Sequence, residues 1–96
     1  MDEQRDKSGR LVVDFHHIEA GMYSKITDGI VGEFGLEVAG EKTIGLDEVF
    51  QYFSRGDMVL SLEWDNWSGY IINAKSASAE KLVRDIASYI NGNFNS

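Results

Sequence analysis

Asp14 and His16 have a spacing that suits metal binding or proton transfer. They lie two residues apart, so a strand would place both side chains on one face. An imidazole beside a carboxylate is a common general base and a common metal-ligand pair. The only other histidine is the adjacent His17, and no His-Glu-x-x-His pattern completes a ligand set. We therefore expect no catalytic residue, metal or cofactor here, and an enzyme that uses His16 and Asp14 is the least favoured interpretation.

Other patterns that carry catalytic or cofactor chemistry are missing from the sequence. The chain has no cysteine, which excludes disulfides, thiolate metal ligands and a cysteine nucleophile. Its ten glycines form neither a Gly-x-Gly-x-x-Gly nor a Gly-x-x-x-x-Gly-Lys-Ser/Thr loop. No nucleotide-binding loop is indicated.

A tryptophan interrupts a segment that otherwise has the composition of a turn. In Asp65-Asn66-Trp67-Ser68-Gly69, the aspartate and asparagine are residues that bond to nearby backbone N–H groups in turns. The tip of a hairpin has little core beneath it. Trp67 is therefore either folded back onto the sheet or presented to a partner. Tryptophan is a preferred anchor residue in protein–protein interfaces.

Acidic residues gather in the middle of the chain. The net charge is −7, and residues 11–69 hold eleven acidic residues against three basic ones. An acidic surface repels phosphate backbones, so we expect no nucleic-acid partner, whereas it speeds encounter with a basic protein. The simpler interpretation is a solvated face that keeps the protein soluble. The candidate partner-binding residues are Glu37, Glu41, Asp47, Glu48, Asp57, Glu63, Asp65 and Trp67.

Hydrophobic periodicity predicts the elements that position these residues. Alternation over Met58–Trp64, followed by the turn and Tyr70–Ala74, predicts a β-hairpin. Apolar residues at helical spacing predict helices over Glu19–Phe34 and Ala79–Asn91. We further expect strands at Leu11–His16 and Leu36–Val38, a short helix over Glu48–Phe53, and either a strand or a loop at Thr43–Leu46.

This order, β-α-β-(α)-β-β-α, predicts an α+β fold. We expect a two-layer sandwich in which one mostly antiparallel sheet of three to five strands carries helices on one face. Residues 1–9 are charged and lack apolar periodicity, which predicts a disordered lead, and residues 10–96 would form one domain.

Nothing in the sequence indicates a membrane or a secretion route. The polar start has no apolar stretch of a signal peptide, and no apolar run reaches the roughly 18 residues of a membrane span. A chain this short that folds without disulfides is typical of an intracellular protein, so we expect the cytoplasm, with the periplasm as the alternative.

The hairpin Leu62-Glu63-Trp64-Asp65-Asn66-Trp67-Ser68-Gly69-Tyr70, together with the small size, acidity and lack of cysteine, resembles the small immunity proteins of bacterial toxin–immunity systems. The resemblance implies a protein that binds a cognate toxin domain and blocks its active site. It implies no particular functional residue.

Three functions are consistent with the sequence. The first is a non-enzymatic protein that binds a basic partner, most concretely an immunity protein or inhibitor that recognises a toxin domain. The second is a small regulatory or complex subunit, as a monomer or as a homodimer joined through a sheet edge. The third is the enzyme described above.

Overall fold

The computed structural model describes residues 2–94, so Met1 and the last two residues of the predicted domain lie outside the described part. The chain forms seven strands, two α-helices and two short 3-10 turns. In order they are β1 (Asp2–Arg5), β2 (Leu11–Phe15), η1 (Ala20–Met22), α1 (Tyr23–Phe34), β3 (Glu37–Val38), β4 (Thr43–Ile44), β5 (Glu48–Arg55), β6 (Met58–Asp65), β7 (Gly69–Ala74), η2 (Ala77–Ala79) and α2 (Glu80–Asn93).

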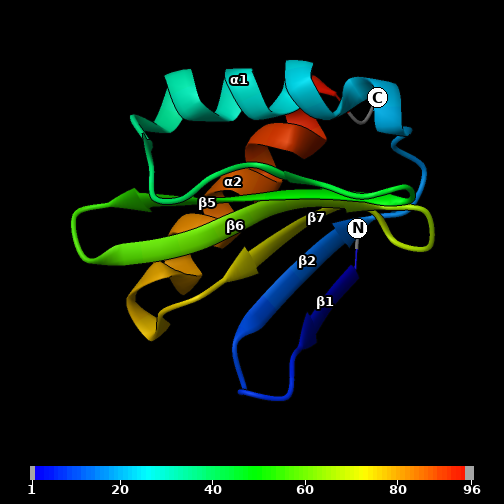
Figure 1. The fold of residues 1–96 in the computed structure, drawn as a ribbon. Coiled ribbons are helices and arrows are strands. Elements are labelled where there is room, and N and C mark those ends of the chain that lie inside the picture. The colour runs from blue at the N-terminus through cyan, green and yellow to red at the C-terminus, as the bar shows by residue number, and fades with distance from the viewer. Residues whose placement is uncertain (1, 95–96) are drawn as a thin grey trace.

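All strands join one antiparallel sheet with the order β1-β2-β7-β6-β5-β3, and β4 also pairs with β5 (Figure 1). The strand β2, early in the chain, therefore lies beside β7, which comes from the last third. This long-range pairing places β7 and β6 at the centre of the sheet.

Both α-helices lie on the same face of the sheet (Figure 1). We call this the covered face and the opposite one the open face. Alternate residues of the strands point to the covered face and form the core with α1 and α2. They include Val13 and Phe15 of β2 and Leu62 of β6, and Ile30 of α1 and Ile86 of α2 pack against them with no exposed surface.

Two tyrosine hydroxyls are hydrogen-bonded beneath α1. The Tyr23 hydroxyl donates to the backbone oxygen of Leu62 over 2.6 Å, and the Tyr70 hydroxyl lies 2.6 Å from the Thr27 hydroxyl. Burial raises the pKa of Tyr23 to about 12, so its phenol stays protonated and keeps donating. These bonds fix α1 along the sheet without leaving buried polar groups unpaired.

The predicted α+β sandwich, with a mainly antiparallel sheet and helices on one face, is confirmed. The hairpin is also confirmed, because β6 pairs with β7 from Leu60–Ala74 to Asp65–Gly69. The sheet has seven strands, more than the three to five expected.

The short helix predicted over Glu48–Phe53 is wrong, because these residues form most of strand β5. Val49, Phe50 and Phe53 have helical spacing, but the segment pairs along its whole length with β6 and on its other edge with β3 and β4. The ladder of backbone hydrogen bonds on both sides outweighs the local helical pattern. The ambiguous segment contains β4 at Thr43–Ile44.

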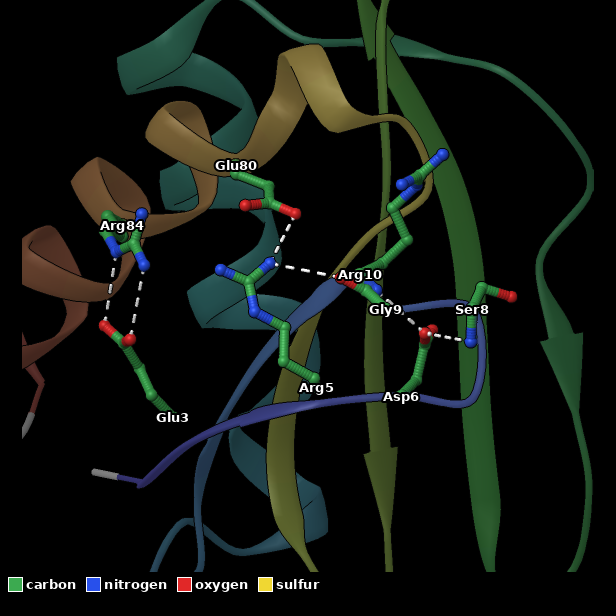
Figure 2. A network of polar contacts seen from close by, with 8 residues as sticks. All are labelled: Glu3, Arg5, Asp6, Ser8, Gly9, Arg10, Glu80 and Arg84. Carbon is green, nitrogen blue, oxygen red and sulfur yellow. Dashed lines mark hydrogen bonds and ion pairs between the residues drawn. The ribbon is translucent and has the colours of Figure 1, made fainter.

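The predicted disordered lead is also wrong for residues 2–5, which form strand β1 at the edge of the sheet. Polar strands give no hydrophobic signal, and β1 is exposed throughout. Its covered-face side chains instead reach α2 (Figure 2): Arg5 Nη1 lies 2.6 Å from Glu80 Oε2, and Arg84 Nε lies 3.4 Å from Glu3 Oε2. Surface ion pairs of this kind contribute little individually, and here they add to strand pairing.

The turn between β1 and β2 is organised by one carboxylate. Asp6 Oδ1 accepts hydrogen bonds from the backbone N–H groups of Ser8 at 2.8 Å and Arg10 at 3.0 Å (Figure 2). This aspartate turn explains why a charged segment without apolar residues still adopts a defined hairpin.

No helix in residues 2–94 is both long enough and apolar enough to cross a membrane.

Ile86→Ala should lower the free energy of unfolding by roughly 2–5 kcal/mol, because it leaves a cavity between α2 and the sheet. Ser88→Ala, at an exposed position of the same helix, should change it by less than about 0.5 kcal/mol. Urea denaturation measures both, and a neutral Ile86→Ala would contradict the packing described here.

Candidate functional site

The turn between β6 and β7 is held rigidly by its first residue. Asp65 Oδ1 accepts hydrogen bonds from the backbone N–H groups of Trp67 at 2.9 Å and Ser68 at 2.6 Å. The N–H of Asn66 donates to the backbone oxygen of Asp47 over 3.0 Å. The turn is therefore fixed both internally and to the segment that precedes β5.

Gly69 is required where this turn re-enters the sheet. Its φ is +74°, and a Cβ atom there would lie 2.1 Å from the backbone oxygen of Phe15. Phe15 pairs with both Gly69 and Tyr70, so a β-bulge brings the two backbones unusually close. Only glycine permits both the conformation and the approach.

Trp67 points away from the core. The residue is 74 % exposed, and the fully exposed Leu46 lines the same shallow hollow of about 310 Å³ with Asp47 and Glu48. The other tryptophan, Trp64, is partly buried and its indole N–H donates to the backbone oxygen of Ile18 over 2.8 Å. The structure thus answers the question left open by the sequence: Trp64 packs against the core, and Trp67 does not.

Carboxylates surround this exposed indole. Glu48 pairs with Asp65 across β5 and β6, and Asp47 precedes Glu48. Within residues 2–94, none of these three carboxylates forms an ion pair. We call the group formed by Leu46, Asp47, Glu48, Asp65 and Trp67 the tip surface.

The remaining predicted binding residues are spread over the molecule. Glu63 lies two residues before Asp65 on the open face, where the Ser61 hydroxyl donates to its carboxylate. Glu37 pairs with Ser54 near the other end of β5, and Asp57 lies in the β5–β6 turn at that end. Glu41 is exposed in the segment between β3 and β4. The structure brings Asp47, Glu48, Asp65 and Trp67 together and places Glu37 and Asp57 away from them.

A second cluster of ionisable groups lies on the open face, where β1 meets β2. His16 Nε2 is 2.6 Å from Asp2 Oδ2 and 3.4 Å from Asp14 Oδ1. The hydrogen bond to Asp2 and the charge of Asp14 raise the pKa of His16, whereas burial raises the pKa of Asp14. The same hydrogen bond lowers the pKa of Asp2.

The carboxylates around His16 influence its protonation. Asp2 and Asp14 favour the protonated imidazole over the neutral one. No serine, threonine or tyrosine hydroxyl in the described part of the chain forms a hydrogen bond with His16.

Sequence reasoning missed two residues that belong to these groups. Leu46 lies in an ambiguous segment, and a single leucine between glycine and aspartate gives no signal of exposure. Asp2 lies in the segment expected to be disordered, so nothing indicated that it faces Asp14. The pairing of β1 with β2 brings Asp2 into place, and the bend between β4 and β5 exposes Leu46. Neither feature is encoded by a local sequence pattern.

No match was found for this chain among protein-family models, curated proteins or solved structures.

Gly69→Ala should lower the free energy of unfolding by more than the roughly 1–3 kcal/mol typical of a strained backbone conformation, because it also forces β7 away from β2. Gly56→Ala is the matched control: its φ is +62°, but no atom lies within 4 Å of the added methyl group. Thermal melting of both variants separates the two effects, and equal losses would show that no close approach exists at Gly69.

Trp67→Ala should change the free energy of unfolding by less than about 0.5 kcal/mol, as exposed positions do. Trp64→Ala should cost about 2 kcal/mol or more, because it removes a packed ring and a hydrogen bond. Denaturant unfolding of the pair measures this difference. A large loss for Trp67→Ala would mean that its indole covers the sheet.

Proposed function

We propose that this protein is a cytoplasmic, non-enzymatic binding protein that recognises a basic protein partner through the tip surface. Its most concrete form is a bacterial immunity protein or inhibitor that binds a toxin domain. The observation that carries the proposal is the exposure of Trp67 on a turn that is already rigid.

Exposing this indole has no structural benefit for the isolated chain. Tryptophan is among the residues most often buried on folding or on binding, and it dominates interface energies when a partner covers it. The hydrogen bonds that Asp65 accepts within the turn are already formed in the free protein, so little conformational entropy is lost when Trp67 is bound. Leu46 extends the apolar area beside it.

The carboxylates of the tip surface define the chemistry of the partner. Asp47 and Glu48 are available to lysine and arginine side chains, because no described residue forms an ion pair with them. The Asp65 carboxylate adds negative charge, and its Oδ1 atom already accepts two hydrogen bonds within the turn. A cationic partner would be attracted at long range and oriented before the indole is buried. An acidic or nucleic-acid partner would be repelled.

A homodimer joined through a sheet edge is supported less well. One edge is β1, whose four residues include three charged ones, and the other is formed by β3 and β4, which have two residues each. Short and charged edge strands oppose edge-to-edge pairing. We therefore favour a different, basic protein as the partner over a second copy of this chain.

Site-specific crosslinking in the organism that encodes the chain tests the proposal. A photoreactive phenylalanine analogue in place of Asn66, which is exposed and adjacent to Trp67, should crosslink one basic protein, identified by mass spectrometry. The same analogue at position 57, in the turn at the other end of the β5–β6 hairpin, is the control and should give no such product. Equal products at both positions, or an acidic product, would refute the tip surface as the binding site.

Binding kinetics with the crosslinked protein, once purified, then separate charge from packing. Trp67→Ala should weaken binding by about 2 kcal/mol or more, which is about 30-fold in Kd, mainly through faster dissociation. Asp47→Lys should slow association, and its matched control Asp57→Lys should have a much smaller effect. The association rate should fall as salt is raised from about 0.1 M to about 1 M, which shortens the screening length from about 10 Å to about 3 Å.

The contradicting outcome is an association rate independent of salt together with unchanged affinity of a folded Trp67→Ala variant. The melting curve of the variant provides the control for folding.

A further inference from the structure

Three potential metal ligands converge where β1 pairs with β2. Asp2 comes from β1, Asp14 from β2, and His16 is the residue that directly follows β2. One ligand atom from each residue lies within 4.8 Å of the other two. The strand pairing, which places Asp2 opposite Asp14, supplies the third ligand that the sequence alone does not reveal.

The Asp14 carboxylate is the group that needs an additional partner. Asp14 is only 4 % exposed, and its Oδ1 atom receives no hydrogen bond from residues 2–94. Its other oxygen, Oδ2, accepts a hydrogen bond from Gln4 Nε2 over 3.3 Å. A buried carboxylate oxygen without a partner is costly, and this one is directed at His16 Nε2, 3.4 Å away.

A proton on His16 does not satisfy both carboxylates. The single Nε2–H group donates to Asp2 at 2.6 Å, which leaves Asp14 Oδ1 at the longer distance without a hydrogen bond. A metal ion differs from a proton in this respect, because it accepts lone pairs from several ligands at once.

We propose that Asp2, Asp14 and His16 bind a divalent transition-metal ion, with Zn²⁺ the ion that suits them best. One imidazole with two carboxylates fits Zn²⁺, whereas Mg²⁺ and Ca²⁺ prefer oxygen ligands throughout. Gln4 orients Asp14 from behind, as outer-shell partners of metal ligands commonly do. Water completes the coordination, because Asp2 and His16 have side-chain exposures of 66 % and 58 %.

The bound ion would fasten the edge strand to the sheet. Asp2 and Asp14 belong to different strands joined by the turn at Asp6, so coordination closes that hairpin at its open end. The proposal does not rest on the partner-binding function, because the chain alone supplies all three ligands.

Calorimetric titration of Zn²⁺ into the metal-free full chain, carrying no added histidine tag, tests the site. We expect one ion per chain, and no binding of Mg²⁺ at the same concentration. His16→Ala should weaken Zn²⁺ binding by at least about tenfold, the smallest effect usual for loss of even an outer-shell partner, and Asp2→Ala should do the same. Both side chains are exposed, so both variants should remain folded.

His17→Ala is the matched control, because it removes the adjacent histidine, which lies outside the cluster. It should bind Zn²⁺ like the unmodified chain, and Zn²⁺ should shift the ring NMR signals of His16 rather than those of His17. Zn²⁺ should also slow hydrogen exchange of the β1 amides. The proposal is overturned if the unmodified chain does not bind Zn²⁺, if His16→Ala binds it unchanged, or if His17→Ala loses it.

Discussion

The structure depends on the packing of two helices against a single face of the sheet. The apolar side chains of α1 and α2 and the covered-face residues of β2, β5, β6 and β7 bury one another, and most of the core lies in this layer. Burial of apolar surface is the main stabilising contribution in a domain of this size. The helices occupy one face only (Figure 1). The open face mixes ionisable side chains such as Asp14 and Glu63 with apolar ones such as Ile71, which pairs with both.

The two helices and strand β6 of this layer were predictable from the sequence. The stripes of α1 and α2 and the alternation of β6 are local patterns, and each reports which side chains point to the core. The strand β5 was not predictable, because Val49 and Phe53 have a spacing that fits a helix as well as a strand. Its strand conformation is decided by hydrogen bonds to β6 and to β3 and β4, which are contacts with other strands and leave no pattern within the segment itself.

The tip surface was likewise predictable only in part, because its residue types are local features and their positions depend on strand pairing. The composition of the β6–β7 turn singles out Trp67, and the charge count singles out the acidic segment. Neither of them shows which acidic residues lie close to Trp67. The register of β5 with β6 places Glu48 beside Asp65. The hydrogen bond from the Asn66 N–H to the Asp47 backbone oxygen holds Asp47 close to the turn that carries Trp67. The same register carries Asp57 to the other end of the hairpin. Similarly, only the pairing of β1 with β2 places Asp2 opposite Asp14.

The central claim is that Trp67 contacts a basic partner, and NMR of the indole groups tests it most directly. The chain has two tryptophans, so its ¹H–¹⁵N spectrum has two indole N–H signals. On addition of the crosslinked partner, the Trp67 signal should shift or broaden. The Trp64 signal should stay in place, because its N–H is bonded to Ile18 within the protein. Binding of the partner with an unchanged Trp67 signal would contradict the account.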